Sequence, residues 1–151
     1  MPTTIPNSHI DLLCAPVYGI LTTVMPDGQP QCSLVWIDYD GCNLLLNTTL
    51  ERQKVKNMRS DPKVTLLVID PQDSSRWLEV RGRVIDMEIC GAEAHADQLT
   101  RRYTGKSSFY GDIYPVEQKQ KETRVIVRIE PIHIALDAFF REPSHAAAHE
   151  L

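Results

Sequence analysis

The chain has 151 residues and a mass of 17.1 kDa, which suits one domain around one hydrophobic core. Its 42% hydrophobic and 24% charged residues exclude a disordered chain. No apolar run approaches the roughly 20 residues of a membrane-spanning helix, and residues 1–13 lack the features of a secretion signal. The net charge of −4 argues against nucleic-acid binding. We therefore expect a cytoplasmic protein with neither a nucleic-acid nor a membrane partner.

Cysteines and histidines form no pattern that predicts a metal site. The four cysteines fall at irregular spacing without a CxxC pair, which favours reduced thiols over a zinc site or a disulfide framework. Two of the five histidines, His145 and His149, lie four residues apart near the end of the chain, and the others are isolated. The chain also lacks a Walker loop, a GxGxxG motif and a Ser-His-Asp order. We expect no bound metal.

The first half of the chain is rich in strand signals. Residues 18–25, 31–39 and 43–48 are rich in β-branched, aromatic and aliphatic residues, and Pro-Asp-Gly and Asp-Gly turns separate them. Short turns of this kind join antiparallel strands, so we expect these three strands to form a meander. A doubly wound α/β fold is excluded because no helix fits between them.

A short helix is predicted over the residues that precede Pro62. Thr48 and Glu51 have the T-x-x-E spacing of a capping box. Val55 and Met58 follow at i, i+3 on one face. Asp61 is pushed out of the helical region by the proline after it, so the helix ends there.

The remaining segments complete a mainly β domain. We expect strands at residues 63–70, 77–86, 123–130 and 132–136, a helix at 91–103 and an irregular segment at 104–120. Six to seven antiparallel strands with short helices predict a closed or split β-barrel. Residues 1–141 would form this single domain, and residues 142–151 a mobile tail.

The segment 51–63 concentrates positive charge at the predicted helix. It holds five basic residues against two acids. One interpretation is a solvated helix face. The other is an anion site, because a strand-to-helix turn with hydroxyls and nearby Arg and Lys attracts anions. Residue patterns alone leave both interpretations open.

The order and spacing of several segments resemble the split-barrel superfamily of pyridoxamine 5′-phosphate oxidase. These segments are the run from YGILTTVM to TLLVIDP, then WLEVRGRV, RRYTGK and RVIVRIEP, over roughly residues 16–134. Within that superfamily, the chain is most similar to the small oxidoreductases that depend on coenzyme F420. The resemblance implies a homodimer of split barrels with a flavin or deazaflavin at each subunit-interface cleft.

The resemblance also assigns site residues. The R-x-K-x-x-N pattern at Arg52, Lys54 and Asn57 matches the family's phosphate-binding helix start, with Asn57 a polar contact or a brace of the helix. Arginine offers a bidentate fork and lysine a compact charge. The strand segments that line the ring and ribityl chain are matched by Ser33, Leu34, Val35, Trp36, Asn47, Thr48 and Thr49. The opposite subunit would contribute Trp77, Glu79 and Arg81.

Two departures from the family affect the choice of cofactor and reaction. Glu51 places an acid beside the phosphate residues, where it would repel the anionic F420 unless it caps the helix, so FMN stays an alternative. The chain also lacks the C-terminal Arg- and Trp-rich segment of true pyridoxamine-phosphate oxidases, so we do not expect pyridoxal phosphate synthesis.

We expect an F420-dependent oxidoreductase that transfers a hydride between deazaflavin and a small organic substrate. An FMN-dependent enzyme or a non-catalytic flavin or haem carrier is the alternative. No residue pattern identifies a catalytic acid or base; water, Tyr103 or Tyr110 could deliver a proton. Loops such as 104–120 would shape the substrate pocket.

Overall fold

The computed structural model describes residues 2–137, so the tail predicted for 142–151 lies outside the described residues. Seven strands follow one another as β1 (Gly19–Val24), β2 (Pro30–Val35), β3 (Asp38–Tyr39), β4 (Leu44–Thr49), β5 (Lys63–Ile69), β6 (Trp77–Glu88) and β7 (Arg124–Leu136). The helices are α1 (Asp11–Cys14), α2 (Gln53–Ser60), α3 (Ala92–Thr104) and α4 (Phe109–Asp112), with 3₁₀ turns η1 (Asn7–His9) and η2 (Val116–Gln120). Every helix within residues 2–137 is too short or too polar to cross a lipid bilayer.

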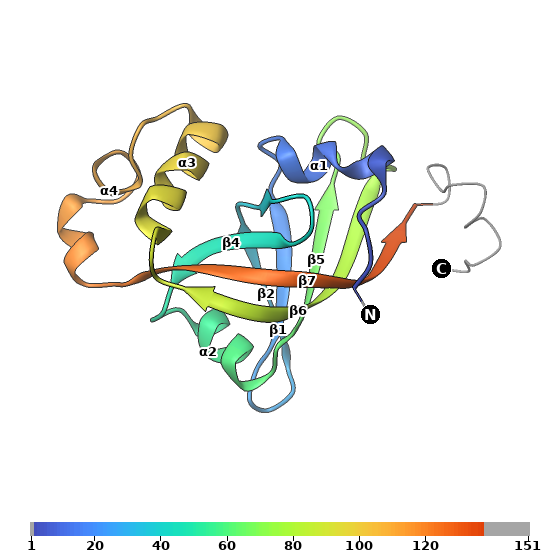
Figure 1. The fold of residues 1–151 in the computed structure, drawn as a ribbon, viewed down its shortest axis with the longest axis horizontal. Helices are drawn as coiled ribbons and strands as arrows, with labels where there is room; N and C mark the ends of the chain where they lie inside the picture. The colour runs from blue at the N-terminus through green and yellow to red at the C-terminus, as the bar shows by residue number, and fades with distance from the viewer. Residues whose placement is uncertain (1, 138–151) are drawn as a thin grey trace.

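The seven strands form one antiparallel sheet that curls into a half-barrel, which confirms the predicted mainly β fold. Their order is β2-β1-β5-β6-β7-β4-β3. Strands β2 and β3 are therefore the two edges of the sheet, yet Trp36 and Ile37 alone connect them. Because such a link spans at most about 11 Å, the sheet must curve until its edges approach each other. Figure 1 shows the resulting shape, with α3 and α4 on one side of the barrel and α2 below it.

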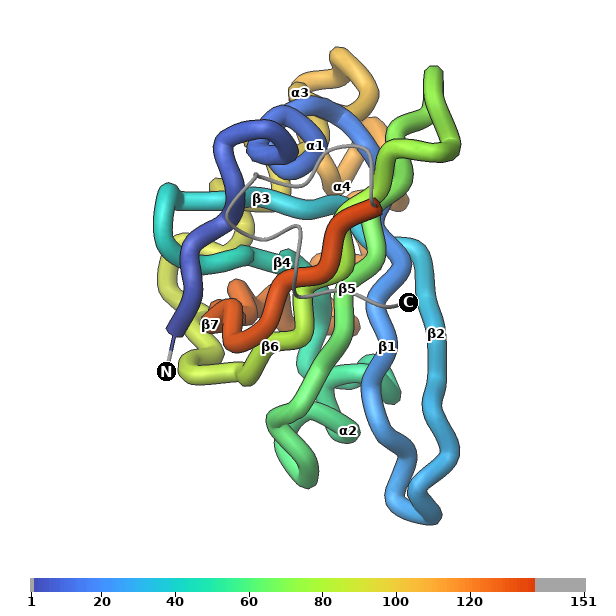
Figure 2. Tube along the Cα trace, turned by 90° about the vertical axis from the view of Figure 1, so that its right-hand side faces the viewer, coloured from blue at the N-terminus to red at the C-terminus, as the bar shows by residue number. Residues whose placement is uncertain are grey.

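This connection corrects the predicted meander. The β1–β2 and β3–β4 hairpins form as expected, but the predicted strand 31–39 is divided between them. Its first part pairs with β1 and its last two residues pair with β4. In Figure 2 the β1–β2 hairpin is a long arm at one edge of the sheet. Short-range turn signals predict hairpins, but they do not show that a strand passes from one edge to the other.

A close fit at Gly19 lets the connecting segment enter the core. The side chain of Ile37 is fully buried. A Cβ atom on Gly19 would lie 2.9 Å from Ile37 Cγ1 and 2.6 Å from Leu66 Cδ1. Glycine is therefore the residue that lets Ile37 pack against β1.

Strand β7 is continuous, although two closing strands were predicted. Pro131 lies within it, opposite Gly82, at a register shift between Arg81 and Gly82. A bulge accommodates a proline because the local ladder is already interrupted. A Cβ on Gly82 would lie 2.8 Å from the carbonyl oxygen of Glu130, so β6 approaches the backbone of β7 closely at this bulge.

The predicted capping box at the start of α2 is wrong. Thr48 belongs to β4, and the N-cap of α2 is Arg52, without a side-chain cap. The Glu51 carboxylate instead accepts a hydrogen bond from the backbone N–H of Thr123, at 3.2 Å from each oxygen. The other predicted features hold, since Val55 and Met58 are buried and the helix ends before Asp61.

Candidate functional site

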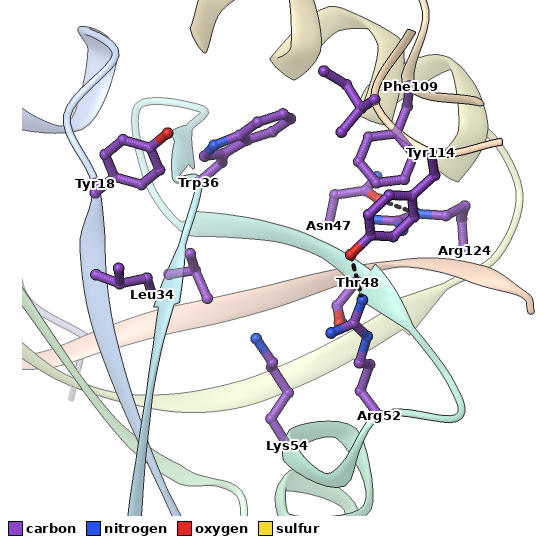
Figure 3. Close-up of a pocket in the computed structure, with 12 residues that line it drawn as sticks. Tyr18, Leu34, Trp36, Asn47, Thr48, Arg52, Lys54, Phe109, Tyr114 and Arg124 are labelled. Atoms are coloured by element: carbon purple, nitrogen blue, oxygen red, sulfur yellow. Dashed lines mark hydrogen bonds between the residues drawn. The ribbon is translucent and has the colours of Figure 1, made fainter. Parts of the chain in front are cut away.

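A pocket of about 240 Å³ lies where the connecting segment after β2, strand β4 and the start of α2 approach the chain after α3. Figure 3 shows side chains from all these elements pointing into it. Its lining residues are Tyr18, Leu34, Val35, Trp36, Asn47, Thr48, Arg52, Lys54, Phe109, Ile113, Tyr114 and Arg124. The pocket therefore combines a cationic side with an aromatic and aliphatic side.

Three cations, Arg52, Lys54 and Arg124, form the cationic side. None of the described residues that line the pocket is acidic. Burial, reinforced by repulsion from Arg52 and Arg124, lowers the pKa of Lys54. No described residue offers the Lys54 ammonium a hydrogen bond or a counter-ion. An anion that entered the pocket would relieve this repulsion, which favours the anion-site interpretation of the basic segment over a solvated face.

Arg52 is held at the rim of the pocket by Tyr114. Its Nη2 donates a hydrogen bond to the Tyr114 hydroxyl at 3.1 Å. Glu51, the neighbour that sequence analysis placed in conflict with an anionic cofactor, is bonded to the backbone of Thr123 instead. It does not line the pocket, so its charge does not face the ligand space.

Arg124 is the buried cation of the site, with a side chain only 6% exposed. Its Nε donates to Asn47 Oδ1 at 2.8 Å. Its guanidinium carbon lies 4.3 Å from the centre of the Phe109 ring, in cation–π geometry. Glu122 Oε1 lies 3.8 Å away, beyond the length of a direct hydrogen bond. These contacts fix the guanidinium, and its charge is partly balanced by this longer ion pair with Glu122.

The aromatic and aliphatic side comes from two distant parts of the chain. Trp36 packs edge-on against Phe109, with ring centres 6.2 Å apart, and Phe109 packs against Tyr114 at 5.1 Å. Across the pocket, Leu34 and Tyr18 are 69% and 55% exposed. A flat ring system suits such a wall, because aromatic and aliphatic faces bind rings without requiring hydrogen bonds.

Seven predicted site residues meet at this pocket: Leu34, Val35, Trp36, Asn47, Thr48, Arg52 and Lys54. Four others, Ser33, Thr49, Asn57 and Trp77, do not line it. Asn57 is fully buried and bonds to Thr23, Gln31 and Gln53, so it braces α2. Trp77 begins strand β6, and its predicted role in a partner subunit stays a prediction.

The hydroxyls of the two tyrosines suggested as proton sources point elsewhere. Tyr103 donates to the Val17 carbonyl at 2.8 Å and accepts from the Ile37 N–H at 2.9 Å, so it clamps the connecting segment. Tyr110 donates to Glu122 at 2.8 Å. Burial and this hydrogen bond raise the pKa of Tyr110 to about 12. Neither side chain lines the pocket.

Sequence reasoning missed five lining residues: Tyr18, Phe109, Ile113, Tyr114 and Arg124. Three of them belong to the segment 104–120, whose role in shaping the pocket was expected but whose residues carried no pattern. Arg124 carried a usable signal, since it is a lone cation at the start of the apolar run VIV. A charged side chain at the start of a buried strand is costly unless it is paired or binds a ligand.

Fold and pocket define the class: a split-barrel protein whose pocket joins a cationic side to an aromatic and aliphatic side. The family described as pyridoxamine 5′-phosphate oxidase matches residues 7–136. The chain belongs to this family, whose members bind flavin or deazaflavin in oxidoreductases.

Solved structures agree with this assignment. One described as an F420 reductase is 36% identical to the chain, with a TM-score of 0.75 over 87% of this chain and 98% of its own. A conserved hypothetical protein from Mycobacterium tuberculosis is 27% identical, with a TM-score of 0.67 over 87% of this chain and 84% of its own. General Stress Protein 26 from Bacillus anthracis shares the fold alone, at 16% identity and a TM-score of 0.62 over 86% of this chain and 91% of its own.

Proposed function

We propose that the protein is an F420-dependent oxidoreductase that reduces small electrophilic organic molecules. The observation that carries this proposal is the pocket itself, in which three cations adjoin an aromatic wall and no described lining residue is acidic. F420 pairs a flat deazaflavin ring with an anionic phosphodiester and glutamate tail. The 36% identity to a structure described as an F420 reductase supports F420 over FMN.

The residues present fit such a cofactor. Arg52 and Lys54 would hold the phosphate, and Arg124 would contribute a third positive charge. Trp36 and Leu34 would flank the ring, where apolar side chains exclude water. When bound, reduced F420 supplies a hydride to an electron-poor acceptor. The protein contributes binding, orientation and a dry pocket.

We also propose that a second copy of the chain completes the site. Tyr18, which precedes β1, and Leu34, which lies on β2, are both exposed beside the pocket. Large apolar side chains exposed at a binding site often mark a protein contact, and the family resemblance implies a dimer. Sedimentation equilibrium is expected to give about twice the monomer mass. A Leu34→Glu variant should then sediment as a monomer, whereas Ile132→Glu, an exposed apolar control elsewhere, should not.

The test of function is a turnover assay with reduced F420 and a panel of activated alkenes, quinones and nitro compounds. Oxidation of F420 that depends on both enzyme and acceptor would support the proposal. Turnover with FMN and NAD(P)H, but not with F420, would assign the scaffold to the flavin enzymes. Binding of cofactor without turnover of any acceptor would instead indicate a carrier.

A further inference from the structure

A chain of four side chains runs from the far edge of the sheet to the pocket. Arg102 Nη1 and the backbone N–H of Tyr39 donate to Asp38 Oδ1, each at 2.9 Å. Asp38 Oδ2 lies 3.0 Å from His95 Nε2, and His95 Nδ1 lies 3.0 Å from Asn47 Nδ2. Asn47 Oδ1 then accepts from Arg124 Nε at 2.8 Å. Asp38, His95, Asn47 and Arg124 thus connect strands β3, β4 and β7 through helix α3.

The neighbours of Asn47 fix the direction of its amide. Arg124 Nε can only donate, so the Asn47 atom that faces it must be the oxygen. The Ala92 carbonyl can only accept, and it lies 2.7 Å from the Asn47 nitrogen. Arg124 thus assigns the oxygen of the Asn47 amide, and the Ala92 carbonyl assigns its nitrogen. It is this nitrogen that also faces His95 Nδ1.

The tautomer of His95 follows from that direction. A nitrogen that receives a hydrogen bond from Asn47 carries no proton, so Nδ1 is the acceptor. The proton of the neutral ring is therefore on Nε2, where Asp38 accepts it. The ring is buried, 8% exposed, and fits a single orientation between a carboxylate and an amide.

We propose that His95 is a positioning residue for the pocket: its Nε2–H tautomer fixes the amide of Asn47, and that amide aims the Arg124 guanidinium at the anionic group of the cofactor. This inference rests on the proposed function. Without an acceptor at Nδ1, the Asn47 amide loses one of the two partners that fix its nitrogen. The Arg124 side chain then loses its preorganised acceptor. Cofactor binding must order that side chain, which weakens the affinity.

Two substitutions of His95 separate this role from simple packing. The oxygen of an asparagine is two bonds from Cβ, as Nδ1 is in histidine, whereas the amide of a glutamine ends three bonds away, as Nε2 does. His95→Asn therefore keeps an acceptor for Asn47 and gives up the contact with Asp38. His95→Gln keeps the contact with Asp38 and gives up the acceptor. If His95 only filled space and satisfied Asp38, glutamine would be the better substitute.

The direct readout is the ¹⁵N-resolved Nε–H resonance of Arg124, assigned by its loss in Arg124→Lys. We expect it to be protected from water exchange in the wild type and in His95→Asn, and to exchange rapidly in His95→Gln. Asn47→Ser removes the amide that accepts from Arg124, so the Arg124 Nε–H should also exchange rapidly in this variant. F420 affinity should fall about tenfold in His95→Gln and less than threefold in His95→Asn.

Equal protection in both His95 variants, or weaker protection in His95→Asn than in His95→Gln, would overturn the positioning role. A wild-type protein that binds neither F420 nor FMN would overturn the proposed function. In that case the Arg124 resonance alone decides whether His95 positions the guanidinium.

Discussion

Joint replacement of Arg52 and Lys54 by alanine is expected to weaken cofactor binding by about 2–4 kcal/mol, or roughly 30- to 1,000-fold in Kd. Each charge-assisted hydrogen bond contributes about 1.5–3 kcal/mol, and two bonds to one phosphate are not additive. Lys54 should account for the larger share. It is half-buried and without a counter-ion, whereas Arg52 is exposed and already bonded to Tyr114.

Isothermal titration calorimetry of the folded double variant with F420 and with FMN measures this loss. The matched control is Lys56→Ala/Arg59→Ala, which removes the same charge from the exposed face of the same helix. An equal loss in both double variants would show that only the net charge of the helix matters. An unchanged affinity of the Arg52/Lys54 variant would refute the phosphate assignment.

Three further variants test the electrostatics and the fold. Lys54→Met should raise the unfolding temperature of the ligand-free protein at pH 7, unlike Lys56→Met. Because burial lowers the pKa of Lys54 in the folded protein, its charge costs stability at pH 7, and this cost begins to shrink only as pH rises above the lowered pKa. Asp38→Asn should destabilise by roughly 2 kcal/mol at pH 7: burial disfavours the carboxylate, but its histidine and arginine partners hold its pKa at about 2. That depressed pKa stabilises the fold above pH 4, and the difference from wild type in urea unfolding should shrink as pH falls from about 4 towards 2. Gly82→Ala should cost about 1–3 kcal/mol in the same assay, since a Cβ would lie 2.8 Å from the Glu130 carbonyl oxygen; an unchanged midpoint would contradict the close approach at the bulge.

Local patterns were enough to predict most elements but not their connections. The alternation from Leu78 to Val84 and the helix before Pro62 follow from periodicity and from proline sterics, and both are present. The division of strand 31–39 depends on Ile37 packing against Gly19, which is a contact between distant residues. The T-x-x-E spacing was misleading because β4 continues through Thr49 before the chain turns into α2.

The candidate site was predicted in part for the same reason. Arg52 and Lys54 form a contiguous motif, so a family resemblance transfers them directly. Arg124 is brought to Asn47 by the pairing of β7 with β4, and no local spacing reports that register. Helix α3 was predicted by its pattern, but His95 is an isolated histidine in the sequence, and only the fold buries it beside Asn47. The sequence therefore carried no sign of the histidine that contacts Asn47, a residue that lines the pocket.

The central claim is that this pocket binds an anionic deazaflavin. Equilibrium titration of the wild-type protein with F420 and with FMN, followed by fluorescence, tests it most directly. We predict saturable F420 binding at one site per chain, tighter than FMN and lost in the Arg52/Lys54 double variant. FMN binding that is tighter than F420 binding would contradict the choice of cofactor, and binding of neither would contradict the claim itself.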